Sequence, residues 1–181
     1  MTKEPGIAFF DLDHTLVDGD SDSSFIDFMD RRGLLPAGVY EAKKPINEAY
    51  MAGRPWQVPY RALLRSIYRD QAVDDLFALA WEHAESEVLP MLFAGARALL
   101  AEARERRGHL VLLTTTNQIV TTPLVELLGL DGLLSSRMEV RDGRFTGEVE
   151  GEFCTGPGKA VALRAYCEAR GVDPADCAMY G

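Results

Sequence analysis

The chain has 181 residues, of which 47% are hydrophobic and 26% charged, a composition typical of globular proteins. Its 19 Lys and Arg against 28 Asp and Glu give a net charge of −9 at pH 7, which argues against a broad nucleic-acid surface. No apolar run approaches the roughly 18 residues that span a bilayer, so we expect no membrane partner. The three cysteines lack metal-ligand spacing, and we therefore expect a reduced, cytoplasmic protein.

Three short apolar runs predict strands buried on both faces, at residues 6–10, 110–113 and 177–180. Helical patterns precede the second and third runs, at 93–107 and 159–170. Strands that alternate with helices indicate an α/β fold with a parallel sheet. Residues 138–147 predict a hairpin, in which Asp142-Gly143 supplies the turn.

Residues 19–91 interrupt this alternation and predict successive helices near 21–32, 36–52, 59–69 and 72–88. The aromatic stripes of these helices favour the core of a small bundle, although some of the aromatic side chains could line a pocket. We expect two domains: an α/β core of residues 1–18 and 92–181, and an inserted helical domain of residues 19–91.

Polar motifs follow the first two predicted strands. Asp11 and Asp13 lie two residues apart on extended chain, so both carboxylates point the same way, and oxygen ligands of this kind suit Mg²⁺. The alternative is a pair of solvated turn acids. Thr114-Thr115-Thr116-Asn117 follows the second strand and is expected to open a helix near 119–128, either as an anion site or as a plain N-cap.

A third motif, Gly156-Pro157-Gly158-Lys159, opens another predicted helix. It is not a Walker A loop, because Ala160 stands where Ser or Thr is required. Taken alone, Lys159 would be a surface cation. The three motifs together indicate more than each does by itself, because they occur in a fixed order around a helical insertion.

This order resembles the haloacid dehalogenase (HAD) superfamily of phosphotransferases, and most of all its phosphoserine phosphatases and histidinol-phosphatase-like enzymes. The resemblance rests on residues 9–16, 108–117 and 154–159. It implies a Rossmann-like core with a parallel sheet, over which the inserted helical bundle closes as a cap. It also implies a Mg²⁺-dependent phosphomonoester hydrolase.

The resemblance assigns roles to individual residues. Asp11 would be the nucleophile that forms an aspartyl-phosphate, and Asp13 the general acid and then the general base. Thr114, the backbone of Thr115 and Lys159 would bind the phosphoryl group. The metal ligands would be Asp11 and Asp13, the latter through its backbone carbonyl. Thr15 would orient this loop, and Asn117 is a weaker candidate for a supporting role at the site. His14 is expected to be structural, with its side chain directed away from the two acids.

The substrate is expected to be a small phosphorylated alcohol or amino alcohol, of the phosphoserine or histidinol phosphate type. Among the clustered acids, Asp20 could meet a substrate ammonium group or simply cap a helix. A substrate carboxylate would require an arginine, for which Arg54, Arg61 and Arg65 are candidates, each of which could equally be solvated. A phosphonate-cleaving relative would need a lysine in the helical insertion, where only Lys43 and Lys44 occur.

Members of the family carry a further acidic motif just after the next strand, where Gly181 ends the sequence. We expect that the natural protein continues beyond this residue. The alternatives are that the first motif alone holds the metal weakly, or that the protein binds phosphometabolites without turnover.

Overall fold

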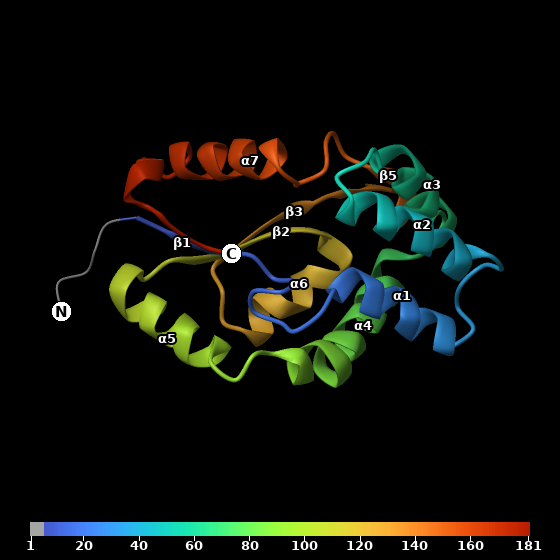
Figure 1. Ribbon diagram of the computed structural model, residues 1–181, viewed down its shortest axis with the longest axis horizontal. Coiled ribbons are helices and arrows are strands. Elements are labelled where there is room, and N and C mark those ends of the chain that lie inside the picture. The colour runs from blue at the N-terminus through green and yellow to red at the C-terminus, as the bar shows by residue number, and fades with distance from the viewer. Residues whose placement is uncertain (1–5) are drawn as a thin grey trace.

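A four-stranded parallel sheet forms the centre of the computed structural model, which describes residues 6–181 (Figure 1). Its strand order is β3-β2-β1-β6, and Ala8 of β1 lies opposite Leu110 and Ala178 of its two neighbours. The strands are β1 (Ala8–Phe10), β2 (Leu110–Asn117), β3 (Gly132–Ser136) and β6 (Ala178–Tyr180). The three strands expected from apolar runs are confirmed. The sequence analysis missed β3, whose Gly-Leu-Leu-Ser-Ser segment contains only two apolar side chains.

Helices cover both faces of the sheet, which explains why the strands are apolar throughout. Phe10 and Leu112 pack on the side of α5 (Ala96–Arg107) and α6 (Gln118–Leu127). Phe9 and Val111 pack on the opposite side, against α7 (Pro157–Glu168). Figure 1 shows α7 on one side of the sheet and α5 and α6 on the other. The expected α/β class is therefore confirmed.

The helix begins directly after the Thr114-Thr115-Thr116-Asn117 motif, as expected, but its N-cap is Asn117, and the expected threonine N-cap is wrong because the three threonines lie inside a strand. β2 extends through Thr114, Thr115 and Thr116, because β-branched side chains fit a pleated strand well. Helix α6 begins only at Gln118, and its N-cap is Asn117, whose Oδ1 accepts a hydrogen bond of 3.0 Å from the Ile119 backbone N–H. The pairing of β2 with β3 shifts register between Leu113 and Asn117, and within this irregular stretch the Thr116 N–H donates to the Thr114 hydroxyl.

The inserted segment is helical, as expected, and lies beyond the carboxyl ends of the strands (Figure 1). Its helices are α1 (Ser21–Arg31), α2 (Val39–Met51), α3 (Gln57–Tyr68) and α4 (Val73–His83). The last was expected to reach residue 88. Instead it continues as a π-helical turn, η1 (Ala84–Val88), and a 3₁₀ turn, η2 (Leu89–Met91), because Pro90 cannot donate to a regular helical ladder.

Two adjacent segments join the insertion to the sheet. Val17 forms an isolated antiparallel bridge with Leu92, and the Asp18 N–H donates to the Met91 carbonyl at 2.8 Å. The chain therefore leaves and re-enters the α/β unit at one place, close to the boundaries expected at residues 18 and 92.

The expected hairpin is confirmed as β4 (Met138–Arg141) and β5 (Arg144–Val149). Asp142 and Gly143 both have positive φ, 51° and 73°, which is the backbone that a two-residue hairpin turn requires. The hairpin packs on the cap helix α3, and Phe145 belongs to the same apolar cluster as Phe25 and Leu64. The core of the cap thus includes residues far beyond the insertion.

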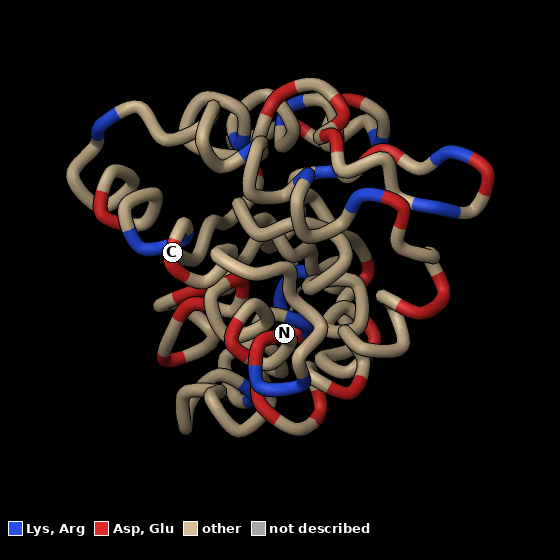
Figure 2. Tube along the Cα trace, turned by 90° about the vertical axis from the view of Figure 1, so that its right-hand side faces the viewer, with Lys and Arg blue, Asp and Glu red and all other residues tan. Residues whose placement is uncertain are grey.

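A final 3₁₀ turn, η3 (Pro174–Asp176), leads into β6. Acidic and basic positions are scattered along the trace and form no continuous basic face in the view of Figure 2. Within residues 6–181, none of the helices combines the length and the apolar character needed to cross a bilayer.

Candidate active site

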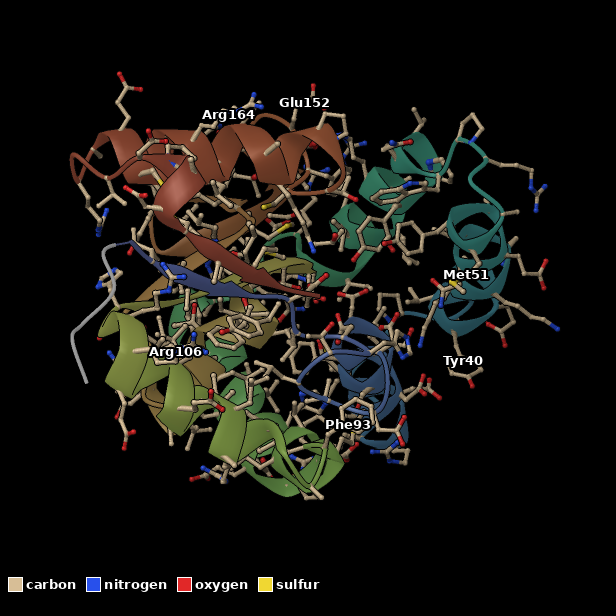
Figure 3. The ribbon with its side chains drawn as sticks, turned by 60° about the vertical axis from the view of Figure 1, so that its left-hand side comes forward. Tyr40, Met51, Phe93, Arg106, Glu152 and Arg164 are labelled. Carbon is tan, nitrogen blue, oxygen red and sulfur yellow. The ribbon has the colours of Figure 1, made fainter. Side chains whose placement is uncertain are left out.

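A cavity of about 150 Å³ lies where the carboxyl ends of β1 and β2 meet the cap. Strand ends in open α/β sheets are the usual position of ligand sites. The cap contributes α1, α2 and the start of α3, and Met51 lies on the side of α2 that faces the sheet (Figure 3). The cavity is lined by Asp11, Asp13, His14, Asp20, Asp22, Ile46, Asn47, Tyr50, Met51, Trp56, Tyr60, Thr114, Thr115 and Thr116.

Asp11 stands directly after β1 and forms an ion pair with Lys159, whose Nζ lies 2.6 Å from Oδ2. The Asp11 backbone N–H donates to the Tyr180 carbonyl at 2.8 Å, which fixes this residue to the neighbouring strand. Oδ1 accepts from the Leu12 N–H at 2.9 Å. The sequence motif therefore places a half-buried carboxylate, which accepts two hydrogen bonds, in the lining of the cavity.

The glycines before Lys159 let the start of α7 approach this carboxylate. A Cβ at Gly158 would lie 2.3 Å from the Phe153 carbonyl oxygen, too close for any other residue. Gly156 has a φ of 48°, which also favours glycine. Lys159 follows in the first turn of α7, and its amine is directed at Asp11 rather than at solvent.

Asp13 is fixed through both carboxylate oxygens. Oδ1 accepts from the Ser21 backbone N–H at 2.7 Å, and Oδ2 accepts from the Thr116 hydroxyl at 2.8 Å. Burial raises the pKa of Asp13 above its ordinary value, and these two donors only partly oppose that rise. Such a group retains a proton more readily than a solvated aspartate does.

The threonines of β2 form one wall of the cavity. Thr114 is buried, and its Oγ1 accepts a hydrogen bond of 3.2 Å from the Thr116 N–H. Its neighbour Thr115 also borders the cavity. Hydroxyl and amide groups thus face Asp11 and Asp13 from the neighbouring strand.

The cap places two further carboxylates in the cavity. Asp20 caps α1, since its Oδ1 accepts from the Ser23 N–H at 2.6 Å, so the N-cap role is confirmed. Asp22 accepts from the Tyr60 hydroxyl at 2.8 Å and from the Asn117 side-chain amide at 3.2 Å. Burial, with the neighbouring Asp20 charge adding to it, raises the pKa of Asp22 to about 7.

Several expected substrate contacts are not at the cavity. Arg54 is exposed, and Arg61 donates to the Gly151 carbonyl at 2.6 Å, because α3 packs against the end of the hairpin. Thr15 also lies outside the lining, within the loop that follows β1, where its N–H donates to the Leu12 carbonyl. Conversely, His14 borders the cavity, although the sequence analysis expected it to point away.

The lysines of the cap are not at the cavity either. Lys43 is buried and pairs with Asp27 at 2.9 Å, and it also donates to the Ser23 carbonyl at 2.8 Å. Lys44 is exposed. The phosphonate chemistry that would require one of them therefore has no support from the geometry.

The comparisons with known proteins agree with this arrangement. The family model of haloacid dehalogenase-like hydrolases matches residues 8–181. The chain belongs to this family. It is 30% identical over 177 residues to the inhibition of morphological differentiation protein of Streptomyces azureus, covering 96% of this chain but 64% of that protein. The chain thus spans less than two thirds of the length of that relative.

Two other proteins are matched over more of their length. A phosphoserine phosphatase of Methanocaldococcus jannaschii is 29% identical over 181 residues, covering 100% of this chain and 79% of that protein. A protein of unknown function from Bordetella pertussis Tohama I has a crystal structure that superposes with a TM-score of 0.82 at 28% identity, covering 98% of this chain and 80% of that chain.

The oxygen donors of this HAD chain fit a magnesium ion. Mg²⁺ commonly keeps several water ligands and takes only one or two carboxylates besides substrate phosphate. Both oxygens of each carboxylate already accept a hydrogen bond, so an Asp11 oxygen would bind the metal in addition to its present donor. The Asp13 backbone carbonyl is the second ligand that the family resemblance implies. Among residues 6–181, no group of three or more His, Cys, Asp or Glu side chains is placed to hold a metal.

The structure adds residues that the sequence analysis did not select. Thr116 and Ser21 fix Asp13, while Trp56 and Tyr60 line the cavity from the cap. The threonine motif itself could have indicated Thr116, since Thr116 belongs to the same run as Thr114. No comparable signal marks Trp56 and Tyr60, which resemble ordinary bundle aromatics until the helices are assembled.

Proposed function

We propose that this site hydrolyses phosphomonoesters of small alcohols or amino alcohols through an aspartyl-phosphate. One observation carries the proposal: Asp11, paired with Lys159, and Asp13, fixed by Thr116, lie at the same cavity beside Thr114. The Methanocaldococcus jannaschii relative, a phosphoserine phosphatase, supports the same chemistry. Nucleic acids and membranes are not among the partners proposed.

The chemistry follows from the roles of the two carboxylates. A carboxylate oxygen of Asp11 attacks phosphorus, and the bond between phosphorus and the alcohol oxygen breaks. Asp13 donates its proton to the departing alkoxide, and its raised pKa favours that protonated form. Asp13, now ionised, then accepts a proton from water as the water attacks the aspartyl-phosphate, which releases inorganic phosphate and restores Asp11.

Positive charge and hydrogen-bond donors stabilise the transferring phosphoryl group. Lys159, which pairs with Asp11, would also neutralise charge on the phosphoryl group, and the Thr114 hydroxyl and the Thr115 N–H would bind the other phosphoryl oxygens. Magnesium bound by the Asp11 carboxylate and the Asp13 carbonyl would add positive charge beside these oxygens. The free cysteines Cys154, Cys167 and Cys177 support the expected cytoplasmic location.

The test is release of inorganic phosphate from an aryl phosphate, measured with Mg²⁺ and with a chelator. We expect turnover only with the metal, and Asp11→Asn should lower it by about 10³-fold or more, since the nucleophile is lost. Asp30→Asn, an exposed acid on α1, is the matched control and should retain activity. Unchanged turnover in Asp11→Asn, or binding of phosphate esters without any turnover, would refute the proposal, and the latter would favour a binding protein.

A further inference from the structure

We propose that the cavity selects phosphomonoesters whose alcohol carries an organic cation, an ammonium or quaternary ammonium group, and no carboxylate. The inference rests on the proposed function for the phosphate end of the substrate. It concerns the opposite end, which the cap surrounds. Charge, aromatic lining and the position of the arginines each support it.

The lining of the cavity is acidic and includes no basic side chain of the described residues other than His14. Four of its residues are carboxylates, Asp11, Asp13, Asp20 and Asp22, and no Lys or Arg borders the cavity among the described residues. Asp11 is balanced by Lys159, but no ion pair within residues 6–181 links the other three to a cation. A cation bound here would therefore relieve repulsion among the acids, whereas a second anionic group would increase it.

Asp22 illustrates the imbalance at the cap end of the cavity. Its carboxylate is partly buried and receives hydrogen bonds only from neutral donors, the Tyr60 hydroxyl and the Asn117 amide. The nearest lysine on α2, Lys43, is already paired with Asp27. Its raised pKa reflects this incomplete compensation. A ligand ammonium group would supply the missing positive charge.

The other wall of the cap end is aromatic. Trp56 is only 8% exposed, and its ring centroid lies 5.2 Å from that of Tyr50 and 5.5 Å from that of Tyr60. Phe153 supports the indole at 5.1 Å. All three rings of Tyr50, Trp56 and Tyr60 border the cavity. The negative faces of aromatic rings attract ammonium groups, and tryptophan attracts them most strongly. Alkylated ammonium groups are commonly bound by clusters of such rings.

Two of the three arginines that could bind a substrate carboxylate contact other groups, and the third, Arg54, is exposed and does not border the cavity. Arg61 donates to the carbonyls of Val149 and Gly151 and stacks 4.8 Å from the Phe153 ring centroid. Arg65 pairs with Glu148 at 2.6 Å. A carboxylate beside the substrate ammonium, as in phosphoserine, would therefore face acids and aromatic rings.

The experiment compares substrates that differ by a single group. We would measure kcat/KM for O-phosphoethanolamine, phosphocholine, O-phosphoserine and glycerol 3-phosphate, with the aryl phosphate as reference. Phosphoethanolamine and phosphocholine should exceed both other esters by about tenfold or more. Phosphoethanolamine and phosphoserine differ only by the carboxylate, so this pair isolates its effect. Equal or better use of phosphoserine or glycerol 3-phosphate would overturn the inference.

Variants of cavity residues test whether the preference for cationic substrates arises at the cap end of the cavity. Asp22→Asn and Trp56→Leu should each lower the ratio of kcat/KM for phosphocholine to that for glycerol 3-phosphate by about fivefold or more. Asp30→Asn lies on the same helix as Asp22, is exposed and should leave this ratio unchanged. A ratio that is the same in both cavity variants and in the wild type would contradict the assignment.

Binding separates this inference from the proposed function. If the aryl phosphate is not hydrolysed, the proposed function fails, and thermal stabilisation then tests the cavity alone. Choline and phosphocholine should raise the melting temperature, phosphoserine should do so less, and Asp22→Asn should reduce the choline effect. If neither choline nor phosphocholine stabilises the protein, the inference is wrong whatever the catalytic result.

Discussion

Asp13 shows how neighbouring side chains set the protonation of one carboxylate. Burial favours its neutral form, while donors from Ser21 and Thr116 favour the ionised form. Burial is the larger effect, so the pKa is raised. A change that removes one donor without changing shape should therefore raise it further.

We predict that Thr116→Val shifts the pH dependence of kcat/KM to higher pH. The proposed first step needs protonated Asp13, so activity falls as pH rises through its pKa. Losing the Thr116 hydroxyl raises this pKa, and the falling limb of kcat/KM should shift to higher pH for an alkyl phosphate. Thr121→Val, which removes a buried hydroxyl that donates to the Asn117 carbonyl, is the control. If the falling limb of this profile stays at the same pH or shifts to lower pH, the Thr116 hydroxyl does not lower the pKa of Asp13.

The raised pKa of Asp22 predicts how the stability of the folded protein depends on pH. Its pKa is about 7 in the folded protein against 3.8 ordinarily, so the folded state holds this proton more tightly. The resulting stabilisation is complete below about pH 4 and is lost as pH rises through about 7. Asp22→Asn should therefore raise the melting temperature relative to wild type more at about pH 8 than at about pH 4. Melting curves between these pH values measure the difference in melting temperature between the variant and the wild type, and for the control Asp30→Asn this difference should not change with pH. An equal difference for Asp22→Asn at about pH 4 and about pH 8 would contradict the prediction.

At the residue scale, the sequence predicted the groups that follow strand ends and not those that come from the cap. Asp11, Thr114 and Lys159 belong to motifs whose placement follows from strand and helix order. Arg61 could not be placed, because its position depends on how α3 meets the hairpin. Arg54 lies in the exposed loop before α3, which no local pattern positions. The role of Trp56 depends on packing that no local pattern encodes.

At the scale of elements, the contact between α3 and β5 holds the cap to the rest of the fold. Arg65 pairs with Glu148, and the backbone of β5 approaches α3 closely at Gly147. A Cβ at residue 147 would lie 2.8 Å from the Arg65 Cα, with little room to move. The hairpin was predictable from Asp142-Gly143, but this close approach was not, since it joins residues far apart in the sequence.

We predict that Gly147→Ala destabilises the protein more than Gly151→Ala does. Both glycines have positive φ, 81° and 67°, so either alanine costs about 1 kcal/mol of conformational strain. Residue 147 would add a backbone clash of about 1–3 kcal/mol, whereas nothing lies within 4 Å of a Cβ at 151. Urea unfolding gives both free energies. Equal losses would mean that α3 and β5 are less tightly packed than the structure indicates.

At the scale of the whole molecule, one apolar cluster joins parts that the sequence assigns to different domains. It contains Phe25 and Leu64 of the cap, Ile119 of α6 and Phe145 of the hairpin. The sequence analysis placed the hairpin with the core because it lies within residues 92–181. Composition and periodicity mark where elements begin and end, but they carry little information about which distant elements share a core.

This shared cluster predicts that cap and sheet unfold together. Trp56 and Trp81 both lie within residues 19–91, so tryptophan fluorescence follows the cap, while far-UV circular dichroism follows all helices and strands. The two unfolding curves should coincide. Phe145→Ala, at a buried position on the hairpin, should lower both midpoints together, with a loss of about 3–5 kcal/mol.

Val140→Ala is the matched control for this change, because Val140 lies in the same hairpin but is 45% exposed, and it should cost much less. If fluorescence lost its signal before circular dichroism, or if Phe145→Ala shifted only one of the two curves, the cap would unfold on its own. The cap aromatics would then be positioned independently of the sheet. Coincident curves instead mean that the residues lining the cap end of the cavity and the strand ends that carry Asp11 are stabilised by the same packing.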